Sequence, residues 1–185
     1  MTVERGRAAS ERVERVDLVP LTSADEWLTE ALETDPEVMR ELGGPIDPDE
    51  VPELHARRVE GIEAGNTWYF TIRLGSDGPP VGTICLWDDD HHDERGGSEA
   101  GWMILPEYQG RGIARAAVRQ LVDMARVDGR LGDIHAYPGV TNAASNALAR
   151  ATGFTLIGTV DVEFRGHQLT CNDWVVRTTE PGATS

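Results

Sequence analysis

The sequence predicts a single domain of the α/β class, built on a mixed sheet with flanking helices. Its 185 residues suit one domain that buries a substantial core. The apolar patterns follow the order β-α-α-α-β-β-β-α-β-α-β-β, and no internal repeat or low-complexity linker divides them. Strands and helices that alternate in this way pack as layers of one folded unit.

The N-terminal third predicts one strand and then three helices. Residues 1–12 are charged throughout and are expected to form a flexible tail, while residues 13–21 alternate as a strand does. The capping box at residues 23–26 predicts the start of a helix that runs to residue 34. Asp-Pro pairs predict the starts of a short helix over 35–43 and of a third helix over 47–64, and glycines follow both.

The remainder predicts six strands and two helices. The strands are expected over 68–74, 81–87, 98–105, 134–137, 154–162 and 169–177. A helix starts at Ile113, with apolar positions at helical spacing as far as Ala125, and a second helix covers 142–152. Residues 178–185 are expected to form a flexible tail, so the domain spans 13–177.

Composition narrows the class of partner. The net charge of −15 argues against nucleic-acid binding, because phosphates would be repelled, and it favours a cationic partner such as an amine. The alternative is that the negative charge only keeps the protein in solution. The chain has no lysine, and its 17 basic residues are all arginine, so the charge balance reflects a compositional bias. We expect no membrane span, a cytoplasmic location, and reduced thiols at Cys85 and Cys171.

A glycine loop stands immediately before the longest helical pattern. Glycines between a strand and a helix let backbone N–H groups face an anion, with the helix dipole assisting, so Gln109–Ala114 predicts a phosphate cradle. A dinucleotide fingerprint would need glycine where Arg115 stands, and a P-loop would need a lysine. The alternative is that Gly110 and Gly112 only make a turn.

The acidic loop 88–97, Asp-Asp-Asp-His-His-Asp-Glu-Arg-Gly-Gly, is a second candidate site. Aspartate and histidine side chains bind divalent metals, but neighbouring residues rarely converge on one ion without a structured turn. No EF-hand or zinc-protease spacing is present. A solvated hairpin loop is therefore the preferred interpretation, and no metal cofactor is expected.

Two motifs in order resemble a known family. The segment "ILPEYQGRGIARA" resembles the acetyl-CoA signature of the GNAT N-acetyltransferase superfamily, through Gln109, Gly112 and Ala114. The segment "TNAASNALARATGFTLIG" resembles that family's next motif, an asparagine (Asn142) followed by Gly153 and Phe154. The start and the end of the domain are similar to the branch that contains the ribosomal-protein N-terminal acetyltransferases, so the resemblance covers residues 13–177.

The resemblance implies a fold and a co-substrate. The sheet would be mostly antiparallel and splayed between its fourth and fifth strands, and the pantetheine arm of acetyl-CoA would lie in the gap. Backbone groups of Met103, Ile104 and Leu105 would pair with its amides. The pyrophosphate would be held by N–H groups of Gly110, Arg111, Gly112, Ile113, Ala114 and Arg115. Asn142 and Asn146 would contact the pantetheine, although Asn142 also suits a helix cap.

The catalytic candidates also follow from the resemblance. Many relatives carry a glutamate on the strand before the loop, here Glu99, as general base; the alternative is an ordinary strand glutamate. The tyrosine acid of many relatives is replaced by Ala149, and the ribosomal-protein branch has a serine at the position of Ser145, which could protonate the thiolate or only satisfy backbone N–H groups. Tyr137 could line the acceptor site, as could His135.

The sequence therefore predicts an N-acetyltransferase that transfers acetyl from acetyl-CoA to a primary amine by direct attack. The acceptor could be a protein N-terminus or a small amine, such as an amino-acid-like metabolite, a polyamine or an aminoglycoside. Two alternatives stay open: a non-enzymatic acyl-CoA sensor and an acyltransferase with a different acyl-CoA donor. The family also suggests a homodimer.

Overall fold

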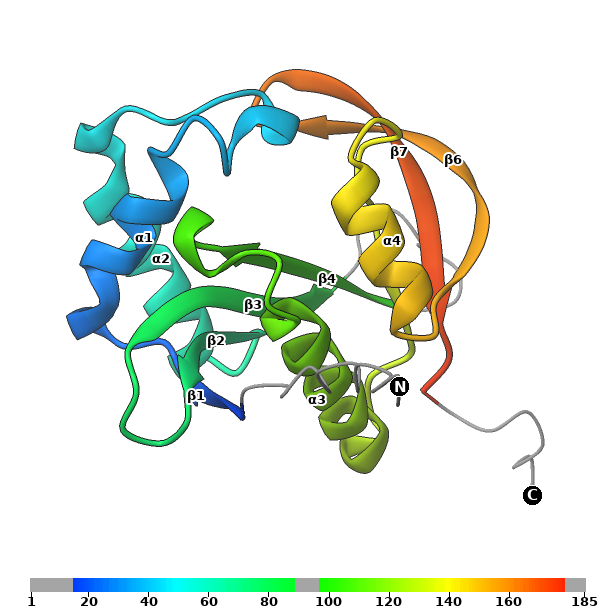
Figure 1. Cartoon of the computed structure of the whole chain (residues 1–185), viewed down its shortest axis with the longest axis horizontal. Coiled ribbons are helices and arrows are strands. Elements are labelled where there is room, and N and C mark those ends of the chain that lie inside the picture. Colours follow the sequence, from blue (N-terminus) through cyan, green and yellow to red (C-terminus); the bar gives the residue numbers. More distant parts are fainter. Residues whose placement is uncertain (1–14, 89–96, 179–185) are drawn as a thin grey trace, which may run out of the picture.

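Seven strands form one sheet in the order β1-β2-β3-β4-β5-β7-β6 (Figure 1). The computed structural model describes residues 15–88 and 97–178. Its strands are β1 (Val16–Pro20), β2 (Thr67–Leu74), β3 (Pro80–Asp88), β4 (Gly97–Ile104), β5 (Asp133–Ala136), β6 (Thr155–Phe164) and β7 (His167–Val176). All neighbours are antiparallel except β4 and β5, so the predicted mixed, mostly antiparallel sheet is confirmed.

Four α-helices cover the sheet from both sides. They are α1 (Glu26–Glu33), α2 (Val51–Glu63), α3 (Ile113–Asp128) and α4 (Ala143–Ala151). Short 3-10 turns complete the list: η1 (Ser23–Asp25), η2 (Arg40–Leu42), η3 (Pro48–Glu50) and η4 (Pro106–Tyr108). Each predicted strand is present within a few residues of its expected bounds. The tails and the loop 89–96 lie outside the described residues.

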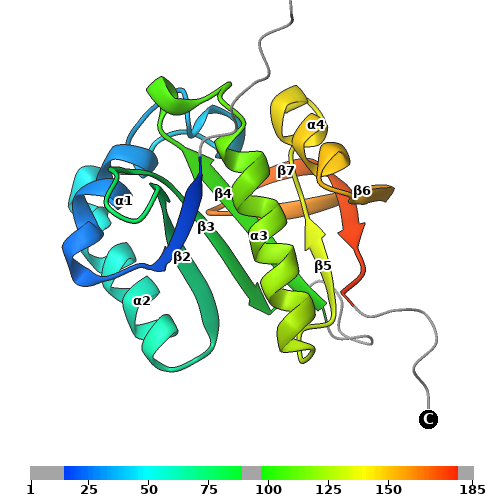
Figure 2. The same ribbon diagram turned by 60° about the horizontal axis from the view of Figure 1, so that its bottom comes forward.

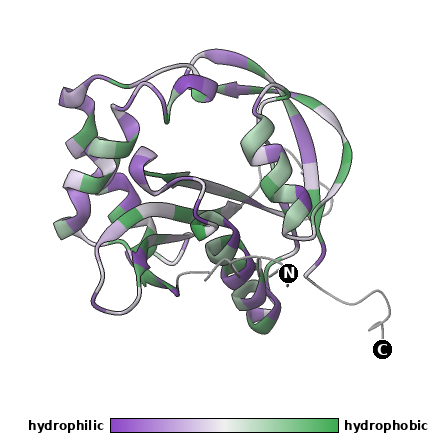
Figure 3. Cartoon of the chain, in the orientation of Figure 1, coloured by the Kyte–Doolittle hydropathy of each residue, from purple (hydrophilic) through white to green (hydrophobic). Residues whose placement is uncertain are grey.

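The main core lies under α3, which crosses the sheet in Figure 2. Ala117, Val118 and Leu121 are fully buried against Ile84 and Ile134 of the sheet. Figure 3 shows hydrophobic and hydrophilic residues alternating along this helix, as expected when one face packs on a sheet and the other meets solvent. α1 and α2 pack on the opposite face through smaller clusters.

One predicted element is wrong. The helix expected over 35–43 is only the 3-10 turn η2, preceded by a turn that Asp35 caps by accepting from the N–H groups of Glu37 and Val38. Gly43 and Gly44 both have positive φ, 89° and 102°, and end the segment. Too few residues lie between these signals to nucleate a stable α-helix.

The sheet opens where its only parallel pair separates. β4 and β5 pair over just three positions, Gly97 to Glu99 against Asp133 to His135. β5 then ends at Ala136, whereas β4 continues to Ile104. Among the described residues, the outer side of β4 therefore has no strand neighbour over its last five residues, which is the predicted splay.

Candidate active site

A cavity of about 740 Å³ runs through the opening between β4 and β5. One end is lined by the glycine loop and the start of α3, including Gln109, Gly112 and Arg115. The other end is lined by α1, α2, η2 and the β6–β7 hairpin. We call these the cofactor end and the acceptor end. Glu99 and Ser145 line the cavity between them.

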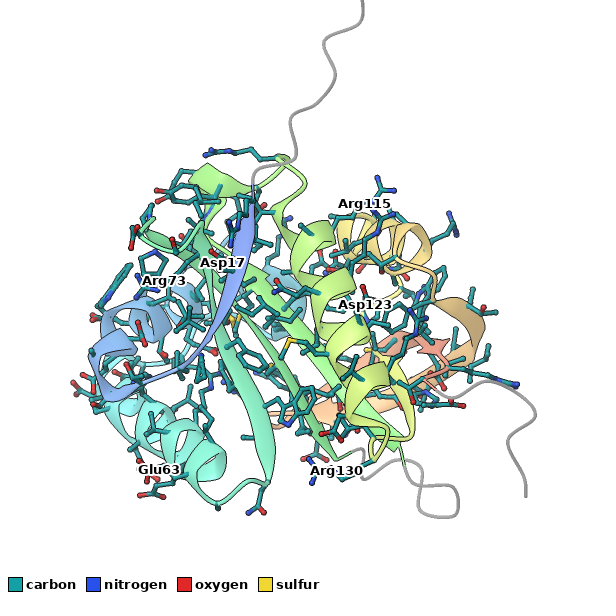
Figure 4. All side chains as sticks on the ribbon, turned by 90° about the horizontal axis from the view of Figure 1, so that it is seen from below. Asp17, Glu63, Arg73, Arg115, Asp123 and Arg130 are labelled. Atoms are coloured by element: carbon teal, nitrogen blue, oxygen red, sulfur yellow. The ribbon has the colours of Figure 1, made fainter. Side chains whose placement is uncertain are left out.

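At the cofactor end the backbone is shaped for an anion. Gly110 and Gly112 have φ of 71° and 76°, a conformation that glycine adopts without strain. Gly112 is the N-cap of α3, yet no side chain caps the helix and no acidic residue stands in its first turn. Arg115 lies at the start of the helix, on the side of α4 (Figure 4). Uncapped N–H groups and the helix dipole favour a bound anion there.

The end of β4 offers backbone groups to the cavity, but not all the predicted ones. The Leu105 N–H donates to the Val81 carbonyl at 2.9 Å, and the Met103 carbonyl faces Gly82 on β3. Antiparallel ladders alternate, so the intervening residues Trp102 and Ile104 point their polar backbone groups away from β3, into the opening. The prediction for Leu105 is therefore wrong at its N–H group, because the ladder already uses it.

The start of α4 faces the same cavity. Asn142 is the N-cap, and its side chain accepts from the Ser145 N–H at 3.0 Å. The Ser145 hydroxyl is therefore not needed as a cap; it accepts instead from the Trp102 indole, at 3.4 Å. An accepting hydroxyl keeps its own proton to donate, which is what a proton donor to sulfur requires.

Asn146 has a structural role that the sequence did not suggest. Its amide nitrogen donates to the Gly139 and Asn142 carbonyls, at 2.9 and 2.8 Å. Its oxygen accepts from Asn172 and from the Trp174 indole, at 2.6 and 2.8 Å. The oxygen of Asn146 thus ties α4 to β7, its nitrogen holds the loop before α4, and Asn146 does not line the cavity. Leu105 and Arg111 do not line it either, and the Arg111 guanidinium lies over the Tyr108 ring.

Glu99 is the last residue of β4 that pairs with β5, and it lies between β3 and β5. Its register partners are Trp87 on β3 and His135 on β5. The thiols of Cys85 and Cys171 lie near enough for its charge to raise their pKa values, after the larger effect of burial. The pKa of Cys85 reaches about 12, so this thiol stays protonated and is no nucleophile at neutral pH. Both cysteines are free and buried, as expected.

His135 and Tyr137 lie beside this carboxylate. His135 is buried, and its Nδ1 lies 2.8 Å from Asp173 Oδ1 on β7. Tyr137 lines the cavity, and its ring stacks on that of His135 with centroids 5.9 Å apart. The pair therefore holds the β5 side of the opening, with Tyr137 as the member exposed to the cavity.

The acceptor end contains an ion cluster that the sequence analysis missed. Glu33 at the end of α1 is 1% exposed and accepts from two arginines, Arg58 of α2 and Arg165 of the hairpin turn. Among the described residues Arg165 alone has positive φ without being glycine, 51°, a strained conformation for a residue with a side chain. These residues are up to 132 positions apart in the chain, so no local pattern could reveal them.

Two further contacts enclose the acceptor end. The His167 ring packs so closely on Gly43 that a Cβ there would come within 2.5 Å of it. The Thr141 hydroxyl donates to Glu41 at 2.7 Å and so joins η2 to the segment before α4. In Figure 1 the segment that follows α1 meets the β6–β7 hairpin across the top of the molecule.

Within residues 15–88 and 97–178 no helix has the length and apolar character that a bilayer crossing needs. The same residues contain no cluster of three or more histidine, cysteine, aspartate or glutamate side chains able to hold a metal. Most of the acidic loop considered as a metal site, residues 89–96, lies outside the described part of the chain.

Comparison with known proteins gives one family. The family model described as "Acetyltransferase (GNAT) domain" matches residues 15–155. The chain is 26% identical over 155 residues to the FsC-acetyl coenzyme A-N(2)-transacetylase of Aspergillus fumigatus, over 78% of this chain. It is 32% identical over 96 residues to the putative ribosomal N-acetyltransferase YdaF of Bacillus subtilis, over 52% of this chain. These matches span only 64% and 47% of the relatives' own lengths.

Solved structures share the fold. The spermidine N-acetyltransferase of Vibrio cholerae, in complex with CoA and spermine, superposes with a TM-score of 0.73 at 21% identity. The superposition covers 88% of this chain and 95% of that one. At this identity the likeness concerns the fold alone.

Proposed function

The chain belongs to the GNAT acetyltransferase family, and we propose that it transfers the acetyl group of acetyl-CoA to a primary amine by direct attack. The observation that carries the proposal is the meeting of three features in one cavity. These are the uncapped start of α3, the unpaired outer side of β4, and a carboxylate with a hydroxyl beside them, Glu99 and Ser145.

The residues present fit acetyl-CoA. Backbone N–H groups of the glycine loop and the first turn of α3 would hold the pyrophosphate. Trp102 and Ile104 would offer their outward backbone groups to the amides of the pantetheine arm, which replaces the missing strand neighbour. The Ile104 carbonyl currently accepts from the Gln109 side chain at 3.0 Å, so Gln109 holds the loop against the strand end. The co-substrate supplies the acetyl group as a thioester.

The reaction exchanges a carbon–sulfur bond for a carbon–nitrogen bond. Glu99 accepts a proton from the incoming ammonium, so that the nitrogen lone pair can attack the carbonyl carbon. The Ser145 hydroxyl, oriented by the Trp102 indole, donates its proton to the departing sulfur and takes up the second proton that the attacking nitrogen releases, so that the serine ends the reaction neutral. The nearby thiols stay protonated, which is consistent with attack that passes through no acyl-enzyme on cysteine.

One measurement distinguishes each competing function from acetyl transfer. An acyl-CoA sensor would bind CoA without turnover, and an acyltransferase for another donor would favour a longer acyl-CoA. The enclosed acceptor end favours a small amine over a protein N-terminus, because the Gly43–His167 and Glu41–Thr141 contacts bridge across it.

Thermal unfolding with acetyl-CoA, CoA, ATP and NAD added separately tests the co-substrate. A ligand at 100 times its dissociation constant stabilises the native state by about 2.7 kcal/mol, which raises Tm by roughly 5 °C or more. We expect this shift with acetyl-CoA and CoA alone. Release of CoA in the presence of an amine then tests the transfer itself. A Tm that no CoA species changes would remove the proposed function.

A further inference from the structure

Three hydrogen-bond donors at the acceptor end line the cavity, and within residues 15–88 and 97–178 none has a hydrogen-bond partner apart from the proximity of Tyr69 and Thr83 to each other. They are the second guanidinium nitrogen of Arg58 (Nη1) and the hydroxyls of Tyr69 and Thr83, all buried. Buried donors left unpaired are costly, and native structures rarely keep three together without a use for them. We propose that these residues bind the carboxylate of the acceptor, so that the acceptor class is an amine that carries a carboxylate.

The three groups lie close together. Tyr69 and Cys85 are register partners on β2 and β3, and Thr83 stands two residues before Cys85 on the same face. The Arg58 guanidinium carbon lies 4.7 Å from the centroid of the Tyr69 ring. Tyr69 is 6% exposed and Thr83 is 1% exposed, so an anion that reached them would leave water. Hydrogen bonds to a charged group are strongest in such a place.

Each group is in the protonation state that an anion needs. Burial acts to lower the pKa of Arg58, but the interactions with Tyr69 and Glu33 outweigh it and raise the pKa overall, so the guanidinium stays charged. Burial raises the pKa of the Tyr69 phenol well above its ordinary value, so its proton is retained as a donor. Glu33 occupies only one nitrogen of Arg58 and leaves the other for a ligand.

Glu99 supplies the complementary charge for the amine. Arg58 lies over Tyr69, the register partner of Cys85 on β2, and Glu99 stands two residues before Gly101, the register partner of Cys85 on β4, so a cation and a carboxylate lie on opposite sides of this thiol. An acceptor whose amine lies toward Glu99 and whose carboxylate lies toward Arg58 matches this arrangement. An amine without a carboxylate would leave the three donors unpaired. A site with buried unpaired donors rejects such analogues for that reason.

A polyamine fits the same cavity poorly. It would need several carboxylates free to face its ammonium groups, but Glu33 is engaged by two arginines. Glu41 accepts from Thr141 and lies 3.6 Å from Arg40. The cluster of Glu33 with Arg58 and Arg165 carries one net positive charge, which repels a polycation.

The inference rests on the proposed acetyl transfer, and matched acceptors test the two separately. We would measure kcat/KM, per deprotonated amine, for 4-aminobutyrate, 4-aminobutanamide, butylamine and spermidine, and repeat the acid–amide comparison with alanine and alaninamide. In at least one pair we expect the acid to exceed the amide by roughly tenfold to a hundredfold, the range for hydrogen bonds to a charged group. Isothermal titration of the CoA-loaded protein with the same pairs should give the same order of affinity.

Two isosteric variants identify the residues. Tyr69→Phe and Thr83→Val remove only the unpaired hydroxyls, so they should leave Tm unchanged or slightly higher, while each lowers the preference for the acid about tenfold. Thr71→Val is the matched control. Thr71 is also buried with an unpaired hydroxyl and faces Thr83 in the register, but it does not line the cavity. The control should keep the preference.

The outcomes separate cleanly. If amines are acetylated but amides or spermidine are used as well as the acids, the carboxylate site is wrong and acetyl transfer stands. If no amine is acetylated, the proposed function fails, and the titrations decide the site by themselves. In those titrations, equal affinity for an acid and its amide would overturn the carboxylate site. A preference for the acid that both Tyr69→Phe and Thr83→Val retain would overturn it as well.

Discussion

The two ends of the cavity are built in opposite ways. The cofactor end consists largely of backbone groups from one continuous stretch, Trp102 to Arg115, shaped by glycines and a helix start. The acceptor end consists of side chains from distant segments, such as Glu33, Arg58 and Arg165. Backbone recognition depends on conformation and tolerates change in most side chains, whereas side-chain recognition changes with each substitution. The first suits a ligand common to a family, the second a ligand particular to one member.

The largest expected effect is at the backbone-built end. Gly112→Val places a β-branched residue at φ of 76°, so the loop must change conformation even though a Cβ would meet no neighbouring atom. We expect CoA affinity, measured by titration calorimetry, to fall at least a hundredfold. Gly129→Val is the control, because Gly129 ends the same helix with φ of 69° and open space around it. It should cost similar stability and leave CoA affinity unchanged; equal losses in both variants would contradict a pyrophosphate site.

The next effect lies where the two ends meet. Glu99→Gln removes the proposed base and keeps the size of the side chain. We expect kcat to fall about a hundredfold, at the lower end of general-base contributions, with CoA affinity unchanged. We expect kcat of the parent protein to fall at low pH, where the base takes up a proton, and this fall should be absent in the variant. A normal rate with an unchanged profile would remove Glu99 as the base.

At the acceptor end, which is built from side chains, Glu33→Gln should lower the stability of the protein and weaken the binding of the acceptor. It leaves two arginines beside a neutral amide in a place that is 1% exposed, and breaking a buried ion pair costs about 3 kcal/mol. We expect a higher KM for the amine and unchanged CoA affinity. The control is Glu53→Gln, in the exposed pair with Arg57, where the expected loss is below about 0.5 kcal/mol. A variant as stable as the parent would mean that the cluster does not hold the hairpin.

The smallest effect is a loss of stability at alkaline pH that comes from the buried thiol of Cys85, between the two ends of the cavity. The native pKa of Cys85 is raised from 9.0 to about 12, so the native state holds this proton more tightly than the unfolded state does. That stability is present below pH 9 and is lost as pH rises toward 12, at up to about 1.4 kcal/mol per pH unit. Tyr69 adds to the slope above its ordinary value of 10.0. Denaturant unfolding between pH 8 and pH 11 should therefore show a shallower slope for Cys85→Ala; equal slopes would contradict it.

The sequence by itself predicted the elements and the cofactor end, because those depend on local signals. Alternating patterns and apolar runs predicted all seven strands within a few residues, and the glycines before Ile113 marked the uncapped start of α3. Asn142 was expected as a helix cap, and the structure shows that cap. Each of these is decided by residues a few positions apart, where backbone conformation and hydrogen bonding are local.

Only the tertiary structure decided what depends on pairing and on contacts between distant segments. Which backbone groups of β4 face the opening follows from its register with β3: the predicted Ile104 faces it, together with Trp102, whereas Met103 and the Leu105 N–H face β3. The sequence predicts that Asn146 contacts the pantetheine, but in the structure its side chain makes four hydrogen bonds to β7 and the preceding loop. The Glu33 cluster joins residues 132 positions apart. Sequence patterns report local preference, whereas the acceptor end is created by folding, which brings those charges together.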